Sequence, residues 1–210
     1  MREQWFADNR DLLKWGTVLE LATRRKARSI LQIAMLTDRT GEQPRPEITT
    51  VGSSFRVPDR VWRLFRSAAS VRRLGSPELA VIFHDAPFTK ASRAEYFRAV
   101  TTRLVKTNPP RIVLIDPDTG LAPRSATERH VMPSELAAVW KVLASGDWIL
   151  LYQHARRSHT WQRETRAALA RSLELQRSNV SVFKSEAVSD VIILGAEKPR
   201  RGVGRNRSTR

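Results

Sequence analysis

Two aspartates and one histidine follow short apolar segments, at positions where a side chain could meet a ligand. Asp116 and Asp118 follow the apolar run 112–115, and His154 follows the run 148–153. Both runs are short, apolar and bounded by turn-forming residues, which is typical of buried strands. Because an ionised carboxylate is costly to bury, two of them directly after a buried strand indicate a functional site.

The aspartate pair is compatible with three kinds of chemistry. Two carboxylates at i and i+2 suit Mg²⁺, with substrate phosphate and water as the remaining ligands. The same carboxylates could accept hydrogen bonds from an amine or a base edge. Alternatively, Asp-Pro-Asp-Thr-Gly is simply a turn, since Asp bonds its own backbone and Pro and Gly fix the backbone angles. A histidine titrates near neutrality, so His154 is a candidate acid, base or ligand, or a residue hydrogen-bonded at a strand end.

The pattern of apolar residues predicts a single α/β domain over 1–197, followed by a disordered basic tail over 198–210. Helices are expected at 8–26, from Pro58, at 91–106, from Pro133 and at 159–176. Strands are expected at 29–36, 48–51, 79–83, 111–115, 148–153, 180–183 and 188–196. This alternation predicts a three-layer α/β/α sandwich, Rossmann-like, with a mostly parallel sheet. The last two strands are too close for a crossover and should form a closing antiparallel pair.

In the common doubly wound strand order, 3-2-1-4-5, the first strand neighbours the fourth, and the fourth neighbours the fifth. Ligands bind beyond the carboxyl ends of such strands, so Asp38, Asp116, Asp118 and His154 should lie on one edge of the sheet. The expected cofactor-binding residues are Asp38, His84 and Asp85, and the expected substrate-binding residues are Lys14, Gln153, Arg156 and Arg157.

The composition favours an anionic partner. The chain of 210 residues has a net charge of +16, and the six Lys and Arg of the tail leave +10 on residues 1–197. Such an excess favours nucleic acid, through phosphate contacts and counterion release, although basic residues also serve solubility. The chain has no cysteine, which excludes disulfides and cysteine-ligated zinc. It has no apolar run long enough to cross a membrane, and the expected location is the cytoplasm.

Several catalytic signatures are absent from the sequence. There is no GxxxxGK[ST], GxSxG or HExxH, and the segment LTDRTGE after the first expected strand has a single glycine, Gly41. These absences exclude P-loop nucleotide hydrolases, serine hydrolases of the nucleophile-elbow type and HExxH metalloproteases.

Four segments resemble an uncharacterised bacterial and phage family for which no activity is known. They are FADNRDLLKWGTVLELA (6–22), IDPDTGL (115–121), GDWILLYQHARR (146–157) and DVIILGAEK (190–198). More distantly, the layout resembles class I S-adenosylmethionine-dependent methyltransferases, which have seven strands, an antiparallel last pair and a catalytic Asp-Pro after strand four. The segment ADNRDLLKW is similar to the helix that precedes the first strand in the ribosomal-RNA adenine methyltransferases of the large subunit.

The methyltransferase resemblance implies that Asp116-Pro117 occupies the position of the DPP[YF] motif, which hydrogen-bonds the target amine. Here Asp118 and Thr119 replace the second proline and the aromatic residue, and no glycine-rich loop follows the first strand. The Asp116-x-Asp118 spacing also resembles the DxD of haloacid-dehalogenase phosphatases and of Toprim nucleases.

Three functions follow as hypotheses. The first is a methyltransferase-like domain that acts on or binds nucleic acid, with S-adenosylmethionine as its cofactor if it is active. The second is a Mg²⁺-dependent nuclease or phosphohydrolase, with Asp116 and Asp118 on the metal and His154 as the base. The third is a non-catalytic module that binds nucleic acid or protein.

Overall fold

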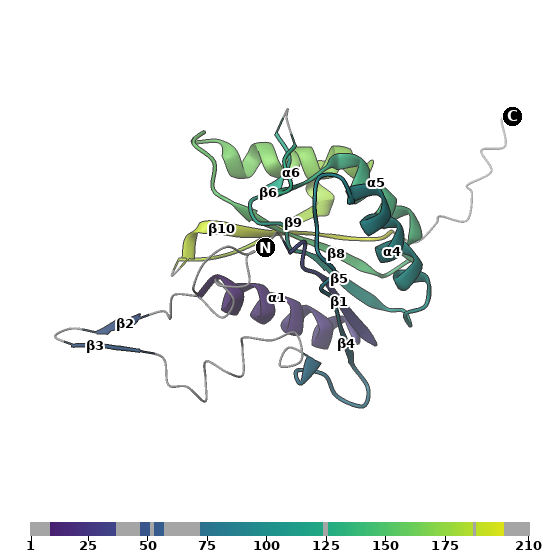
Figure 1. Cartoon of the computed structure of the whole chain (residues 1–210), viewed down its shortest axis with the longest axis horizontal. Helices are drawn as coiled ribbons and strands as arrows, with labels where there is room; N and C mark the ends of the chain where they lie inside the picture. Colours follow the sequence, from purple (N-terminus) through teal and green to yellow (C-terminus); the bar gives the residue numbers. More distant parts are fainter. Residues whose placement is uncertain are drawn as a thin grey trace, which may run out of the picture.

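A computed structural model describes residues 9–36, 47–50, 53–56, 72–123, 126–186 and 188–199. The helices are α1 (Asn9–Arg25), α4 (Arg93–Val105), α5 (Pro133–Val142) and α6 (Trp161–Ser172), with one 3₁₀ turn, η2 (Arg177–Asn179). One six-stranded sheet contains, in spatial order, β4 (Ala80–His84), β1 (Ser29–Ile33), β5 (Arg111–Ile115), β8 (Trp148–His154), β10 (Val188–Glu197) and β9 (Val180–Ser185). The protein is thus a mixed α/β fold around one sheet (Figure 1).

The sheet is mostly parallel. Strand β1 pairs in parallel with β4 and β5, and β5 pairs in parallel with β8. Strand β10 is antiparallel to both β8 and β9. The expected neighbours of the first, fourth and fifth strands and the expected closing antiparallel pair are therefore confirmed.

The expected place of the second strand is wrong. Strand β2 (Glu47–Thr50) pairs with β3 (Ser53–Arg56) in a separate antiparallel hairpin, and β4 takes the place beside β1. A central parallel strand is covered on both faces and needs a continuous apolar sequence. The segment Glu-Ile-Thr-Thr does not supply one, whereas Ala80–His84 contains Val81, Ile82 and Phe83. The helix expected from Pro58 lies outside the described residues.

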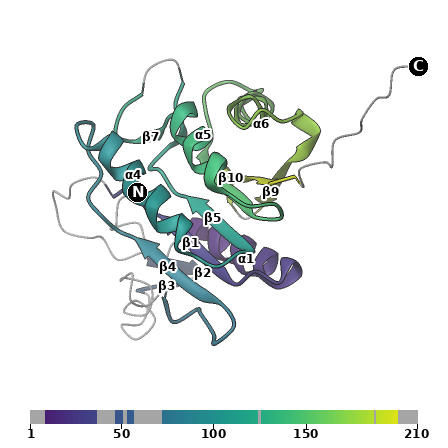
Figure 2. The ribbon, with the colours of Figure 1, turned by 90° about the vertical axis from the view of Figure 1, so that its right-hand side faces the viewer.

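Helices cover both faces of the sheet. Alternate strand residues such as Ile30 and Ile112 pack with Trp15 and Val18 of α1. The residues between them, such as Leu31 and Val113, pack with α4, α5 and α6. The views in Figures 1 and 2 agree, with α1 on one face and the other three helices on the opposite face. This two-sided burial explains why β1, β5 and β8 are apolar almost throughout.

The loop after β5 contains two short strands, β6 (Gly120–Leu121) and β7 (His130–Val131), which pair in parallel.

The C-terminal segment 198–210, which was expected to be a disordered tail, begins with residues that contact the domain. Lys198 N–H donates to the carbonyl of Asp147 at 2.7 Å, and Lys198 Nζ donates to the carbonyl of Trp140 at 2.8 Å. The domain therefore includes Lys198 itself.

Candidate functional site

The side chain of Asp116 is buried where β5 leaves the sheet. Its backbone N–H donates to the carbonyl of Ile33 on β1 at 3.0 Å. The carboxylate is 0% exposed, and it accepts hydrogen bonds from Gln32 Nε2 at 2.8 Å and from Lys14 Nζ at 3.0 and 3.1 Å. Helix α1 and strand β1 thus both supply partners to this one carboxylate.

Lys14 binds a second carboxylate from its own helix. Its Nζ lies 2.6 Å from Asp11 Oδ1, and both side chains are 4% exposed. The i, i+3 spacing places the two residues on one face of α1. Burial alone would lower the pKa of Lys14, but Asp11 and then Asp116 raise it above its ordinary value. Asp11, Lys14 and Asp116 therefore form a buried ion-pair cluster, and an outside amine cannot reach Asp116 without displacing Lys14.

His154 connects to this cluster through Tyr152. Lys14 Nζ lies 4.4 Å from the centre of the Tyr152 ring, and Tyr152 Oη is 3.0 Å from His154 Nε2. Burial and the charge of Arg10 lower the pKa of His154 and so favour its neutral form. Arg10 is itself bound to Asp190 at 2.6 Å, and its hydrogen bond lowers the pKa of Asp190.

Asp118 is bound to a different cation from Asp116. Its Oδ2 accepts a hydrogen bond from Arg129 Nε at 2.6 Å, and the neighbouring Thr119 N–H donates to the carbonyl of Arg129 at 2.9 Å. The described part of the chain has no group of three or more His, Cys, Asp or Glu placed to hold a metal ion. The geometry therefore gives no support to a shared Mg²⁺ site on the two aspartates.

Gln153 holds the loop after β5 against β8. Its Oε1 accepts from Leu121 N–H at 2.9 Å, and its Nε2 donates to the carbonyls of Thr119 at 3.1 Å and His154 at 2.7 Å. Gly120 has a φ of +118°, and a Cβ there would lie 2.3 Å from Gln153 Oε1. Glycine is needed at this position both for its backbone angle and for the close approach. Gln153, which was expected to bind substrate, therefore holds the loop in place.

The two arginines expected to bind substrate differ in their surroundings. Arg156 is half-buried and its Nη2 donates to the carbonyl of Leu121, while burial lowers the pKa of its guanidinium. Arg157 is exposed. Arg156 thus holds the loop after β5 in place through its hydrogen bond to Leu121, whereas Arg157 is exposed to solvent.

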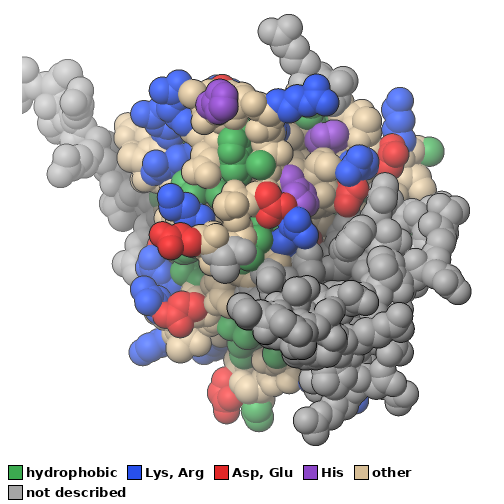
Figure 3. Space-filling view, turned by 90° about the vertical axis from the view of Figure 1, so that its left-hand side faces the viewer, with side chains coloured by type: hydrophobic (Ala, Val, Ile, Leu, Met, Phe, Trp, Pro, Cys, Tyr) green, Lys and Arg blue, Asp and Glu red, His purple; other side chains and the backbone are tan. Residues whose placement is uncertain are grey.

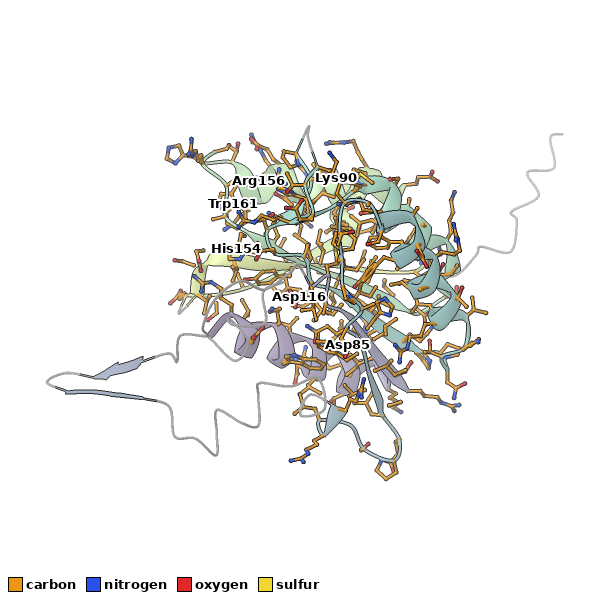
Figure 4. All side chains as sticks on the ribbon, viewed as in Figure 1. Asp85, Lys90, Asp116, His154, Arg156 and Trp161 are labelled. Carbon is orange, nitrogen blue, oxygen red and sulfur yellow. The ribbon has the colours of Figure 1, made fainter. Side chains whose placement is uncertain are left out.

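Of the residues expected to bind a cofactor, His84 and Asp85 lie at the carboxyl end of β4, which is separated from β5 and Asp116 by β1. Asp38 lies outside the described residues. His84 is buried with its ring edge-on to Tyr96, 4.7 Å between ring centres, and burial followed by the charge of Arg103 lowers its pKa. Asp85 is exposed, and Figure 4 places it on the far side of Asp116 from His154.

Two features were missed by reasoning from the sequence. The first is the ion pair between Asp11 and Lys14. Their i, i+3 spacing on an amphipathic helix could have predicted it. The other is a groove of about 720 Å³ between α6, η2 and β9, whose basic lining includes Arg163, Arg166, Arg177 and Lys184. The chain reversal after α6 brings these residues together, and only the first two are close in sequence.

Comparison of the sequence with models of protein families and with curated proteins gave no match. Of the helices in the described ranges, none has both the length and the apolar character needed to cross a membrane.

Proposed function

We propose that this protein binds nucleic acid through a Rossmann-like, three-layer α/β domain of the methyltransferase type. In this domain the carboxylate of Asp116, which in a methyltransferase would accept a hydrogen bond from the target amine, is already held in an ion pair with Lys14. The observation that carries the proposal is the contact of Lys14 with Asp116. Lys14 lies in ADNRDLLKW, which resembles the first helix of the ribosomal-RNA adenine methyltransferases, and Asp116 belongs to the Asp-Pro that this resemblance places at the DPP[YF] position. Their meeting at the carboxyl end of β5 supports a common origin for the two resemblances.

The arrangement of the sheet gives further support to the methyltransferase type. Asp116-Pro117 follows a strand that lies beside β1, and the last strand, β10, is antiparallel to its neighbours. The helices on both faces of the sheet are compatible with a three-layer arrangement. The net charge of +16 supports a polyanionic partner.

The surroundings of Asp116 favour binding over methyl transfer. The target amine of a methyltransferase would need the Asp116 carboxylate, which Lys14 and Gln32 already occupy. The described residues directly after β1, which are 34–36, give no support to an S-adenosylmethionine site. Met35 is fully buried and its backbone N–H donates to Tyr96 Oη at 3.0 Å, so this N–H is not free for a cofactor. We therefore derive no methyl-transfer step.

The nuclease hypothesis has less support. Asp116 and Asp118 are each bound to a different cation, Lys14 and Arg129. A metal ion would have to displace both cations before it could bridge the two carboxylates, whereas binding of nucleic acid at the surface leaves both pairs intact.

A thermal-shift experiment tests the proposal. A mixed-sequence RNA or DNA at about 100 times its Kd should stabilise the protein by about 2.7 kcal/mol, since it binds the folded state. S-adenosylmethionine at millimolar concentration should give no shift. The proposal fails if nucleic acid gives no shift at low salt, and its non-catalytic form fails if S-adenosylmethionine stabilises the protein.

A further inference from the structure

We propose that the basic groove between α6, η2 and β9 binds the phosphodiester backbone of the nucleic acid. This inference rests on the proposed function and names the surface that performs it. The groove has a volume of about 720 Å³ and is lined by Arg163, Arg166, Arg177, Lys184 and His159, together with neutral residues. Among the described residues that line it, none is an aspartate or a glutamate.

The path of the chain explains why this groove is open and basic. Helix α6 ends at Ser172, and the chain reverses through η2 and returns along β9. At the start of β9, Val180 is fully buried in the core beneath α6. Two and four residues later, Val182 and Lys184 lie on the same side of the strand and line the groove together with residues of α6. Along β9, the side chains on this face therefore change from a buried apolar one, Val180, to an exposed charged one, Lys184.

The cations of the groove are available to a ligand. Arg163, Arg177 and Lys184 are exposed, and among the described residues none of the three takes part in an ion pair with a carboxylate. Arg166 donates its Nε to the carbonyl of Val180 at 2.7 Å, which anchors it at the inner end of the groove. The acid of α6, Glu164, accepts hydrogen bonds from Thr160 and Ser158, which lower its pKa, and the charge of Arg163 lowers that pKa further.

A second groove of similar volume differs in its charge pairing. It lies between α1 and β9, shares Val182 and Lys184 with the first groove, and is also lined by Arg24 and Arg25. Arg24 is bound to Glu20 at 2.6 Å and Arg25 to Glu197 at 3.2 Å. Because these arginines already have carboxylate partners, the groove beside α6 is the better site for phosphate.

The charge pattern fits an extended polyanion. Lys and Arg side chains are spread down the left side and across the upper part of the face in Figure 3, and the groove residues belong to three separate elements. Each cation that meets a phosphate releases counterions, so the affinity should depend steeply on salt. Trp161 is only 8% exposed and belongs to the core, so we assign the groove phosphate contacts and no base stacking.

The test compares two triple variants by fluorescence anisotropy with labelled RNA and duplex DNA of about 20 nucleotides per strand. The groove variant is Arg163→Gln, Arg177→Gln and Lys184→Gln. The matched control, Arg72→Gln, Arg73→Gln and Lys106→Gln, removes the same charges from exposed residues outside the groove. A third variant, Arg163→Lys, Arg177→Lys and Lys184→Arg, keeps the charges.

We expect the affinity of the groove variant to fall at least about tenfold, with the salt slope reduced by about 1 for each phosphate that the variant no longer neutralises. The control and the charge-keeping variant should bind like the wild type. Preference for RNA or for DNA identifies which backbone the groove takes.

If the wild type binds nucleic acid and the groove variant binds equally well, the groove assignment is overturned while the proposed function stands. If no protein binds nucleic acid, both fail. If the groove variant loses only its binding to vesicles rich in anionic phosphatidylglycerol, the groove is a lipid site and the inference is overturned.

Discussion

Replacing Lys14 with methionine should lower the free energy of unfolding by about 3–5 kcal/mol, the usual effect of removing one partner from a buried ion pair. Methionine keeps most of the length of the side chain but leaves Asp11 and Asp116 buried without their ammonium partner. Asp116 is 0% exposed and would keep Gln32 as its side-chain donor. Urea unfolding followed by circular dichroism measures the change.

Two further variants separate charge from packing at Lys14. Lys141→Met, on an exposed site of α5, should change stability by no more than about 0.5 kcal/mol. Adding Asp11→Asn and Asp116→Asn to Lys14→Met should recover part of the stability, because no unpaired charge then remains buried. A Lys14→Met protein as stable as the Lys141→Met control would show that the cluster contributes nothing to the fold.

Asp147→Ala should have an effect of similar size, about 3–5 kcal/mol, at the opposite end of the sheet. Asp147 is 0% exposed and binds Arg111 Nε at 2.7 Å. It also accepts from the backbone N–H groups of Arg111 at 2.8 Å and Ala144 at 2.7 Å. The alanine would remove the carboxylate partner of a buried guanidinium, which would keep only backbone carbonyls such as that of Leu104, and the acceptor of one buried and one half-buried N–H group.

Asp85→Ala is the matched control for this variant, because Asp85 is exposed. It should change the free energy of unfolding by no more than about 0.5 kcal/mol. Equal unfolding midpoints in urea for Asp147→Ala and Asp85→Ala would contradict the structural role given to Asp147.

The parallel part of the sheet could be predicted because its strands are buried on both faces and are therefore apolar throughout. This signal located β1, β5 and β8, and the common doubly wound strand order placed these three strands correctly beside one another. It failed for the segment 48–51, which contains two threonines and forms a hairpin apart from the sheet. A count of strands along the chain cannot show which of them is apolar enough to lie beside β1.

The candidate site could be predicted only in part. The end of β5 was found from its aspartates, because a carboxylate after a buried strand is unusual. The partner of Asp116 was not found, because Lys14 is 102 residues away in sequence and was expected to bind substrate instead. His154 was expected beside Asp116, but it connects to the cluster through Tyr152.

The basic groove could not be predicted from the sequence for a related reason. Arg163 and Arg166 are three residues apart on α6, but nothing in the helix pattern indicates that Arg177 and Lys184 return to them. That depends on the tight reversal through η2 and on the antiparallel position of β9 at the edge of the sheet.

The salt dependence of nucleic-acid binding by the unmodified protein tests the central proposal most directly. Between about 50 and 200 mM salt, the logarithm of the affinity should fall linearly with the logarithm of salt concentration, by about 0.7–0.9 for each phosphate contacted. Three or more phosphates bound in the groove would give a slope steeper than about −2. An affinity that does not change with salt, or no binding at about 50 mM salt, would contradict the proposal that this domain binds nucleic acid through its basic surface.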